Sequence, residues 1–264
     1  MKDRTKTIMR RAVIALALSA AAVPALANHA WSTYHWIKGS GQLTVPVGDN
    51  VNSVWDSALV TAVSDWNQST VIQSPLVAGS TSPKRCAGVS GTIQVCNAAY
   101  GRTGWLGLAS ISLSGGHISQ GTTKLNDTYF GSAPYNTPAW RALVTCQEVG
   151  HDYGLGHQDE VFTNPNLNTC MDYSNDPSTN QHPNAHDYEQ LLAIYNHQEL
   201  AASVSPAAAS SGVEVGDTPG EWGRAVHLDG HGRPDVFERA EAGGGKTITH
   251  VFWAIGEGPR VNRF

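Results

Sequence analysis

Apolar residues recur at helical spacing in three parts of the chain. Within residues 50–68 they fall three and four apart, which predicts an amphipathic helix capped by Asp49 or Asn50. A second helix is predicted over 137–153, where Thr-Pro makes a good start. A third is predicted within 182–200. Its expected apolar face comprises Tyr188, Leu191, Leu192 and Tyr195.

The remaining pattern is typical of short strands and of one linker. Residues 71–130 contain β-prone runs broken by Gly, Ser, Pro and Asn. The Ala/Ser-rich stretch AASVSPAAASSG indicates a linker, assigned to 201–216, and three strand-like runs follow in 217–264. The order of elements therefore predicts an α/β (α+β) chain, with one large domain over 28–200 and a small β-rich C-terminal tail.

The N-terminus has the three-part layout of a secretory signal peptide. A basic start precedes an apolar run, and Pro-Ala-Leu-Ala ends the segment at residue 27. This apolar run is too short to cross a bilayer, which takes about 20 residues, and no later stretch is long enough. We therefore expect a secreted protein, extracellular or periplasmic, that begins near Asn28 and has no membrane span.

Charge and cysteine content limit the partners and the compartment. Beyond residue 27 the chain has 12 Lys and Arg against 21 Asp and Glu, a net charge near −9, so nucleic acid is not an expected partner. Four cysteines in an oxidising compartment suggest two disulfides with three possible pairings. Sequence proximity favours Cys86–Cys96, which leaves Cys146–Cys170.

Residues 147–157, QEVGHDYGLGH, have the spacing of a metal site. Gln147 and His151 lie one helical turn apart on the same face, and Glu148 lies about 100° round the helix. Gly154 can adopt the left-handed conformation that ends a helix, so His157 can turn back toward the first two side chains. Catalytic zinc uses three protein ligands and a water, which leaves Glu148 free to take a proton.

This stretch resembles the H-E-x-x-H-x-x-G-x-x-H motif of the metzincin metallopeptidases at every fixed position but the first. Downstream, NTCMDYS resembles their Met-turn, which would place Met171 beneath the metal. Its Met-x-Tyr form is similar to that of astacins and serralysins, which implies that Tyr173 is an auxiliary ligand or a transition-state donor. Over roughly residues 30–200 the order of elements resembles matrixin-like domains and implies a metzincin-like zincin, in which a twisted mixed sheet accompanies an active-site helix and a C-terminal helix.

Gln147 stands where the motif has histidine. Its neutral carbonyl oxygen is a poorer zinc donor than an imidazole nitrogen, so weaker zinc binding is expected. Alternatively, Gln147 bonds the backbone and two histidines hold a weak or empty site. His117 is either an ordinary strand histidine, a cleft residue or a substitute ligand. A Cys146–Cys170 disulfide would tie the active-site helix to the Met-turn.

The resemblance implies a secreted zinc-dependent endopeptidase, a monomer that acts on protein or peptide substrates. One Zn²⁺ would be held by Gln147, His151 and His157, with Glu148 as general base. Calcium lacks support, because the acids that follow His157 do not form a spaced set of oxygen ligands. No cysteine-containing pro-segment is expected before the first strand, so latency through a cysteine is not predicted. The alternative is a catalytically inactive secreted binding module with a metzincin fold and a degenerate metal site.

Overall fold

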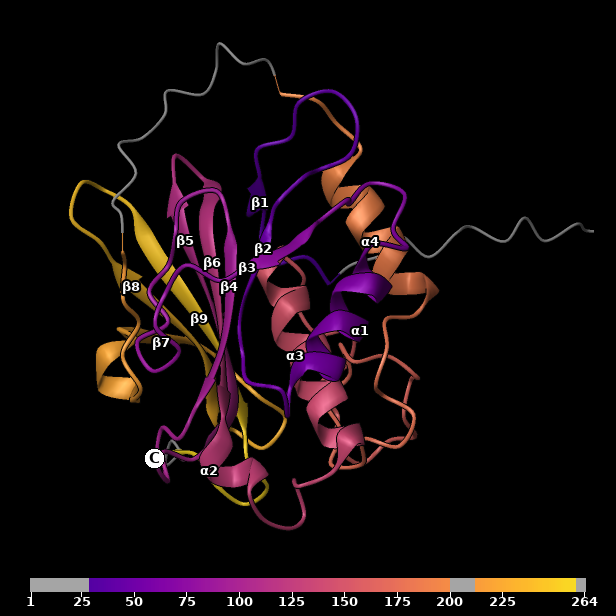
Figure 1. The fold of residues 1–264 in the computed structure, drawn as a ribbon, viewed down its shortest axis with the longest axis vertical. Helices are drawn as coiled ribbons and strands as arrows, with labels where there is room; N and C mark the ends of the chain where they lie inside the picture. Colours follow the sequence, from indigo (N-terminus) through magenta and orange to yellow (C-terminus); the bar gives the residue numbers. More distant parts are fainter. Residues whose placement is uncertain (1–28, 200–211, 260–264) are drawn as a thin grey trace, which may run out of the picture.

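The computed structural model describes residues 29–199 and 212–259 (Figure 1). The predicted signal peptide and residues 201–211 of the predicted linker lie outside this range. In chain order the elements are β1 (His35–Trp36), β2 (Val47–Asn50), α1 (Asp56–Trp66), β3 (Leu76–Ala78), β4 (Ile93–Ala98), β5 (Trp105–Ser114), β6 (His117–Asn126), α2 (Asp127–Phe130), α3 (Pro138–Asp152), α4 (Ala185–Tyr195), the 3-10 helix η2 (Pro219–Glu221), β7 (Arg224–Leu228), β8 (Pro234–Ala240) and β9 (Lys246–Trp253).

The strands form one mixed sheet, nine-stranded within the described ranges, in the order β3-β2-β4-β6-β5-β9-β8-β7. Strand β1 lies off this path and pairs with the start of β6. Pairing is parallel among β3, β2, β4 and β6. It is antiparallel between β6 and β5 and from there through β9 and β8 to β7. A mixed sheet with few helices agrees with the α/β class that the sequence predicts.

Helices α1 and α3 lie against one face of the sheet (Figure 1). Helix α3 begins as predicted, because the Thr137 hydroxyl accepts the Trp140 N–H at 3.2 Å. Helix α1 begins later than predicted, and the proposed caps at Asp49 and Asn50 are wrong. Both residues belong to β2, where the Asn50 side chain donates to Gln94 Oε1 at 3.0 Å and is not available to cap a helix.

Helix α4 is present, but its predicted apolar face is partly wrong. Leu191 and Tyr195 are fully buried, whereas Leu192 is 41% exposed. Adjacent helical residues point about 100° apart, so Leu192 cannot share the buried face with Leu191. The helix starts after Asn184, whose side chain accepts the His186 N–H at 2.8 Å.

The tail contains the three predicted strands, and they extend the main sheet (Figure 1, yellow). Strand β9 pairs antiparallel with β5 along nearly its whole length. Its side chains alternate between the two faces, as strand geometry requires. Ile248 and Phe252 join the core beneath the helices, whereas Val251 and Trp253 pack with Trp222 on the opposite face.

Both favoured disulfides are present, Cys86–Cys96 and Cys146–Cys170. The second joins α3 to the segment that carries Met171. Disulfides are typical of proteins in oxidising compartments. Within the described residues, none of the helices combines the length and the apolar character needed to cross a membrane.

Candidate metal centre

The loop after α3 returns His157 to the helix. Gly154 has a φ of +91°, and a Cβ at this position would lie 2.6 Å from the Tyr34 carbonyl oxygen. Only glycine fits such a turn without strain. The turn brings His157 Nε2 to 3.1 Å from His151 Nε2. The spacing in the sequence therefore predicts this pair correctly.

The two facing nitrogens are suited to share a cation. His151 Nδ1 lies 2.8 Å from the Leu155 carbonyl, so its N–H donates there and Nε2 is left with a lone pair. Burial lowers the pKa of His151 well below its ordinary value and that of His157 to about 3, which keeps both rings neutral. An Nδ1–H bonded to a carbonyl is also the arrangement that orients metal-binding histidines.

A third imidazole comes from the tail. The nitrogens of His151, His157 and His250 that could bind a metal all lie within 4.8 Å of one another. His250 is 3% exposed, and neither of its ring nitrogens has a hydrogen-bond partner within the described residues. Sequence reasoning missed this residue. The sequence feature that could have identified His250 is its position between Ile248 and Phe252, on the apolar face of a strand.

Gln147 is buried on α3, one helical turn before His151, with both amide atoms unsatisfied. It makes no hydrogen bond to any described part of the backbone, so the alternative role considered for it is not observed. A buried amide without partners costs free energy unless something else satisfies it. Gln147 therefore remains a candidate ligand.

Glu148 lies between α3 and β5. A Cβ on Gly107 of β5 would lie 2.7 Å from Glu148 Oε1, and the backbone of Ala109 lies close to the carboxylate. Burial, reinforced by the nearby Asp152, raises the pKa of Glu148 well above its ordinary value. Its Oε2 has no partner within the described residues. Such a carboxylate is a suitable proton acceptor near neutral pH.

Met171 and Tyr173 both lie at this centre. Met171 is fully buried below α3. The Tyr173 ring lies 3.9 Å, centroid to centroid, from the His157 ring, and its hydroxyl hydrogen-bonds to the carboxylate of Asp235 in the tail strand β8. Tyr173 is thus close to a candidate ligand, with its hydroxyl held by the tail.

The other residues considered lie elsewhere. His117 belongs to a separate cluster with His35 and Glu199. The Asp159 carboxylate accepts hydrogen bonds from Val161 N at 2.5 Å and Asn164 Nδ2 at 2.6 Å, so it is an ordinary loop acceptor in this structure.

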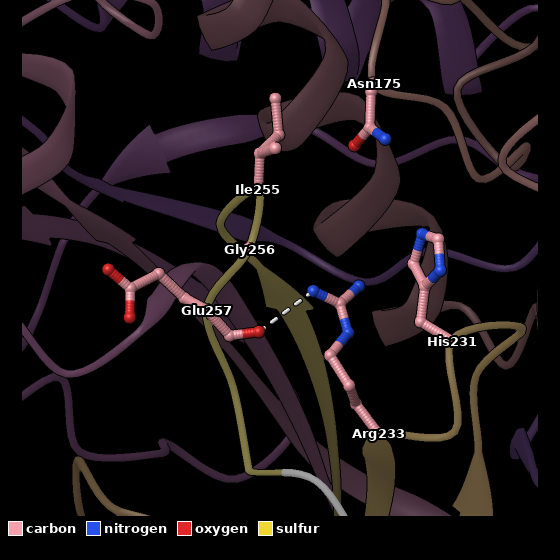
Figure 2. A pocket seen from close by; sticks show the side chains of 6 residues that line it. All are labelled: Asn175, His231, Arg233, Ile255, Gly256 and Glu257. Carbon is pink, nitrogen blue, oxygen red and sulfur yellow. Dashed lines mark hydrogen bonds between the residues drawn. The ribbon is translucent and has the colours of Figure 1, made fainter.

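A cavity of about 370 Å³ opens between the loop after Tyr173 and the tail (Figure 2). It is lined by Asn175, His231, Arg233, Ile255, Gly256 and Glu257. Arg233 donates to the Glu257 carbonyl at 3.0 Å and pairs with Asp229 at 2.7 Å. Because none of the candidate metal ligands lines this cavity, it is distinct from the metal centre.

No protein-family model matches the chain, and no curated protein does. Among solved structures, High choriolytic enzyme 1, a hatching enzyme zinc-protease from the medaka fish Oryzias latipes, is similar with a TM-score of 0.35 and 13% identity. The match covers 65% of this chain and 100% of that one. A similarity of this size assigns neither a family nor an activity.

Proposed function

We propose that the chain is a secreted zinc-dependent endopeptidase that hydrolyses peptide bonds in protein or peptide substrates. The observation that carries the proposal is the pair of neutral imidazoles, His151 and His157, with facing Nε2 atoms, together with the buried carboxylate of Glu148 on the same helix as His151. Two buried imidazole nitrogens at this distance share either a proton or a cation, and His151 Nε2 is the acceptor in both cases. A carboxylate next to such a cation is the arrangement of a hydrolytic metal site.

The available donors suit zinc. His151 and His157 supply two nitrogens, and His250 or the amide oxygen of Gln147 can supply a third donor. Zinc accepts three such ligands in catalytic sites, whereas calcium requires six to eight oxygens. Three neutral imidazoles without a cluster of carboxylates therefore fit zinc and do not fit calcium.

In the proposed mechanism, zinc supplies a Lewis acid that polarises the scissile carbonyl and makes water more acidic. Glu148 takes a proton from the attacking water, because its raised pKa makes it a strong enough base. It then passes this proton to the departing amine. The Tyr173 hydroxyl would donate to the developing oxyanion once released from Asp235.

The second candidate is a secreted binding module that retains the fold without catalysis. The burial of the site supports it, because Gln147, Glu148 and His250 are all at most 3% exposed. A site closed to solvent in this way cannot admit a peptide in the conformation described.

The test is Glu148→Gln, with zinc content and hydrolysis of an unfolded protein such as casein measured on the same samples. Under the proposal, the variant retains zinc and loses nearly all hydrolysis, as removal of a general base predicts. Glu189→Gln, on the exposed face of α4, is the matched control and should behave as wild type. The binding module would be favoured if wild type binds zinc but shows no hydrolysis that Glu148→Gln abolishes, and if the same holds for the Thr249→Pro variant described below.

A further inference from the structure

We propose that β9 lies where an extended peptide substrate would bind, and that its His250 is a ligand of the metal. This inference rests on the proposed peptidase function. It assigns the tail as a segment that closes the site of its own chain.

The edge of β5 is the natural place for a peptide near Glu148. The Glu148 carboxylate touches this strand at Gly107 and lies close to the backbone of Ala109. An extended peptide commonly binds by adding a strand to a sheet edge, through backbone hydrogen bonds. A peptide added beside Ala109 would therefore lie next to both the general base and the candidate ligands.

Strand β9 occupies this edge. In the antiparallel register, His250 lies opposite Ala109 and Thr249 lies opposite Ser110. The Ser110 and Thr249 hydroxyls are 2.9 Å apart, and the strands remain paired from Trp105 to Leu113. The backbone groups of β5 that could bind a substrate are thus already paired with the tail.

The register also explains how the tail reaches the metal centre. Alternation along β9 directs His250 toward α3, on the same face as Ile248 and Phe252. The His250 ring stacks on that of His151 with centroids 3.9 Å apart. A substrate strand at this position would present its scissile bond where the tail presents an imidazole.

A second contact fixes the tail at Tyr173. The Asp235 carboxylate bonds the Tyr173 hydroxyl and also lies 2.8 Å from Nδ1 of His227. His227 in turn faces Glu160 at 3.4 Å, three residues after His157. The tail therefore engages both the candidate ligands and the proposed oxyanion donor.

Cobalt-loaded protein provides a test that does not depend on activity. The ring N–H of each imidazole bound to paramagnetic Co²⁺ gives its own strongly shifted proton signal, so the ligating histidines can be counted. We expect His250→Ala to lose one of the signals seen in wild type. His182→Ala, which removes a surface histidine bonded to Asp65, should lose none. The same number of signals in His250→Ala and in wild type would overturn the role of His250.

Thr249→Pro tests the closure of the site. Thr249 lies between Ser110 of β5 and Phe237 of β8, and proline cannot donate to either strand. We expect casein hydrolysis per bound zinc to rise about tenfold or more, because closed molecules are unavailable to substrate. Thr249→Ala, which keeps the backbone N–H, should resemble wild type. A synthetic peptide of residues 246–253 should inhibit the opened variant, and its His250→Ala version should inhibit it far less.

The two proposals fail in different ways. A folded Thr249→Pro variant that binds zinc but is no faster than Thr249→Ala would overturn the closure and leave any activity of wild type standing. Loss of one histidine signal in His250→Ala, with no hydrolysis in any variant, would refute the peptidase and keep His250 as a ligand. If Thr249→Pro does not fold, the histidine count decides the role of His250.

Separately, the geometry points to a second metal site, formed by His35, His117, His197 and Glu199. Glu199 Oε1 lies 3.0 Å from His35 Nε2 and 2.5 Å from His117 Nε2. His197 Nε2 lies 3.2 Å from His35 Nε2. Three imidazoles and one carboxylate make a donor set that suits tetrahedral zinc.

The orientation of His35 is a separate observation that is compatible with a bound cation. Its Nδ1 lies 2.7 Å from the Thr33 carbonyl and so carries the proton when the ring is neutral. Its Nε2 lone pair then faces a carboxylate oxygen and another imidazole nitrogen. Bound zinc would satisfy all of these groups and pin residues 197–199 to β1 and β6.

Zinc stoichiometry tests this second site. Wild type and His182→Ala should each retain two zinc ions per chain after dialysis against a weak chelator, and His117→Ala should retain one. One ion in wild type, or no loss in His117→Ala, would show that the cluster is only a hydrogen-bonded network.

Discussion

Gly150 of α3 lies directly on Met171. A Cβ on Gly150 would be 2.7 Å from the Met171 sulfur and 2.6 Å from Cζ2 of Trp66 in α1. Helix α3 therefore meets α1 and the methionine at a position without a side chain, one residue before His151. This contact sets the distance between α3, which carries the candidate ligand His151, and Met171.

Gly150→Ala should destabilise the protein. Alanine favours a helix over glycine by about 1 kcal/mol, but overpacking at these two contacts should cost about 1–3 kcal/mol. Urea unfolding should give a lower free energy for this variant. Gly39→Ala is the control, because a Cβ there meets nothing within 4 Å. A more stable Gly150→Ala protein would contradict the packing described.

The Cys146–Cys170 disulfide should stabilise both the fold and the metal centre. Replacing both cysteines with alanine should lower the free energy of unfolding by about 2–4 kcal/mol. It should also speed zinc loss to a chelator, because α3 and the Met171 segment are no longer joined. The Cys86→Ala/Cys96→Ala protein is the comparison. It should lose stability while zinc is released at the wild-type rate.

Gln147→His should bind zinc more tightly than wild type, by about tenfold or more, because imidazole nitrogen is the better donor to zinc. Gln147→Ala should bind it more weakly. Competition with a chromophoric chelator measures both changes. Equal affinity in all three proteins would mean that Gln147 is not a ligand and that His250 completes the set.

Glu221 should stabilise the tail in a pH-dependent way. The Thr218 hydroxyl, followed by the backbone N–H groups of Thr218 and Asp217, donates to this carboxylate and lowers its pKa below the ordinary 4.5. A lowered pKa in the folded state adds stability above the unfolded value, and this is lost as the pH falls through the folded value.

Glu221→Gln should therefore be less stable than wild type at about pH 7, and the difference should shrink at about pH 3. Urea unfolding at both pH values measures it. The same difference at both would show that the ionised carboxylate contributes nothing.

Local patterns in the sequence predicted the parts of the site that are close together along the chain. The cap at Thr137, the turn at Gly154 and the approach of His157 to His151 follow from short-range geometry, and the structure has all three. The start of α1 was mispredicted, because pairing with β4 holds Asn50 in a strand.

The place of the tail could not be predicted in this way. Apolar and polar residues that alternate along the tail indicate a strand, but this pattern does not show which neighbouring strand it pairs with. His250 lies 93 residues after His157 along the chain and meets it only because β9 pairs with β5. Strand order is a property of the whole sheet, so this residue became visible only in the fold.

Pairing with β9 also determines which strand borders solvent. Within the described residues, the sheet ends on the side of the tail at β7, whose residues are all exposed and whose register is interrupted on both sides of His227. Irregular edges of this kind resist aggregation, whereas long regular edges recruit strands from other molecules. Displacement of the tail would expose β5, ten residues long and largely apolar. The segment that covers the candidate metal centre would thus also protect the chain from self-association, and an opened molecule would be short-lived at high concentration unless a substrate took its place.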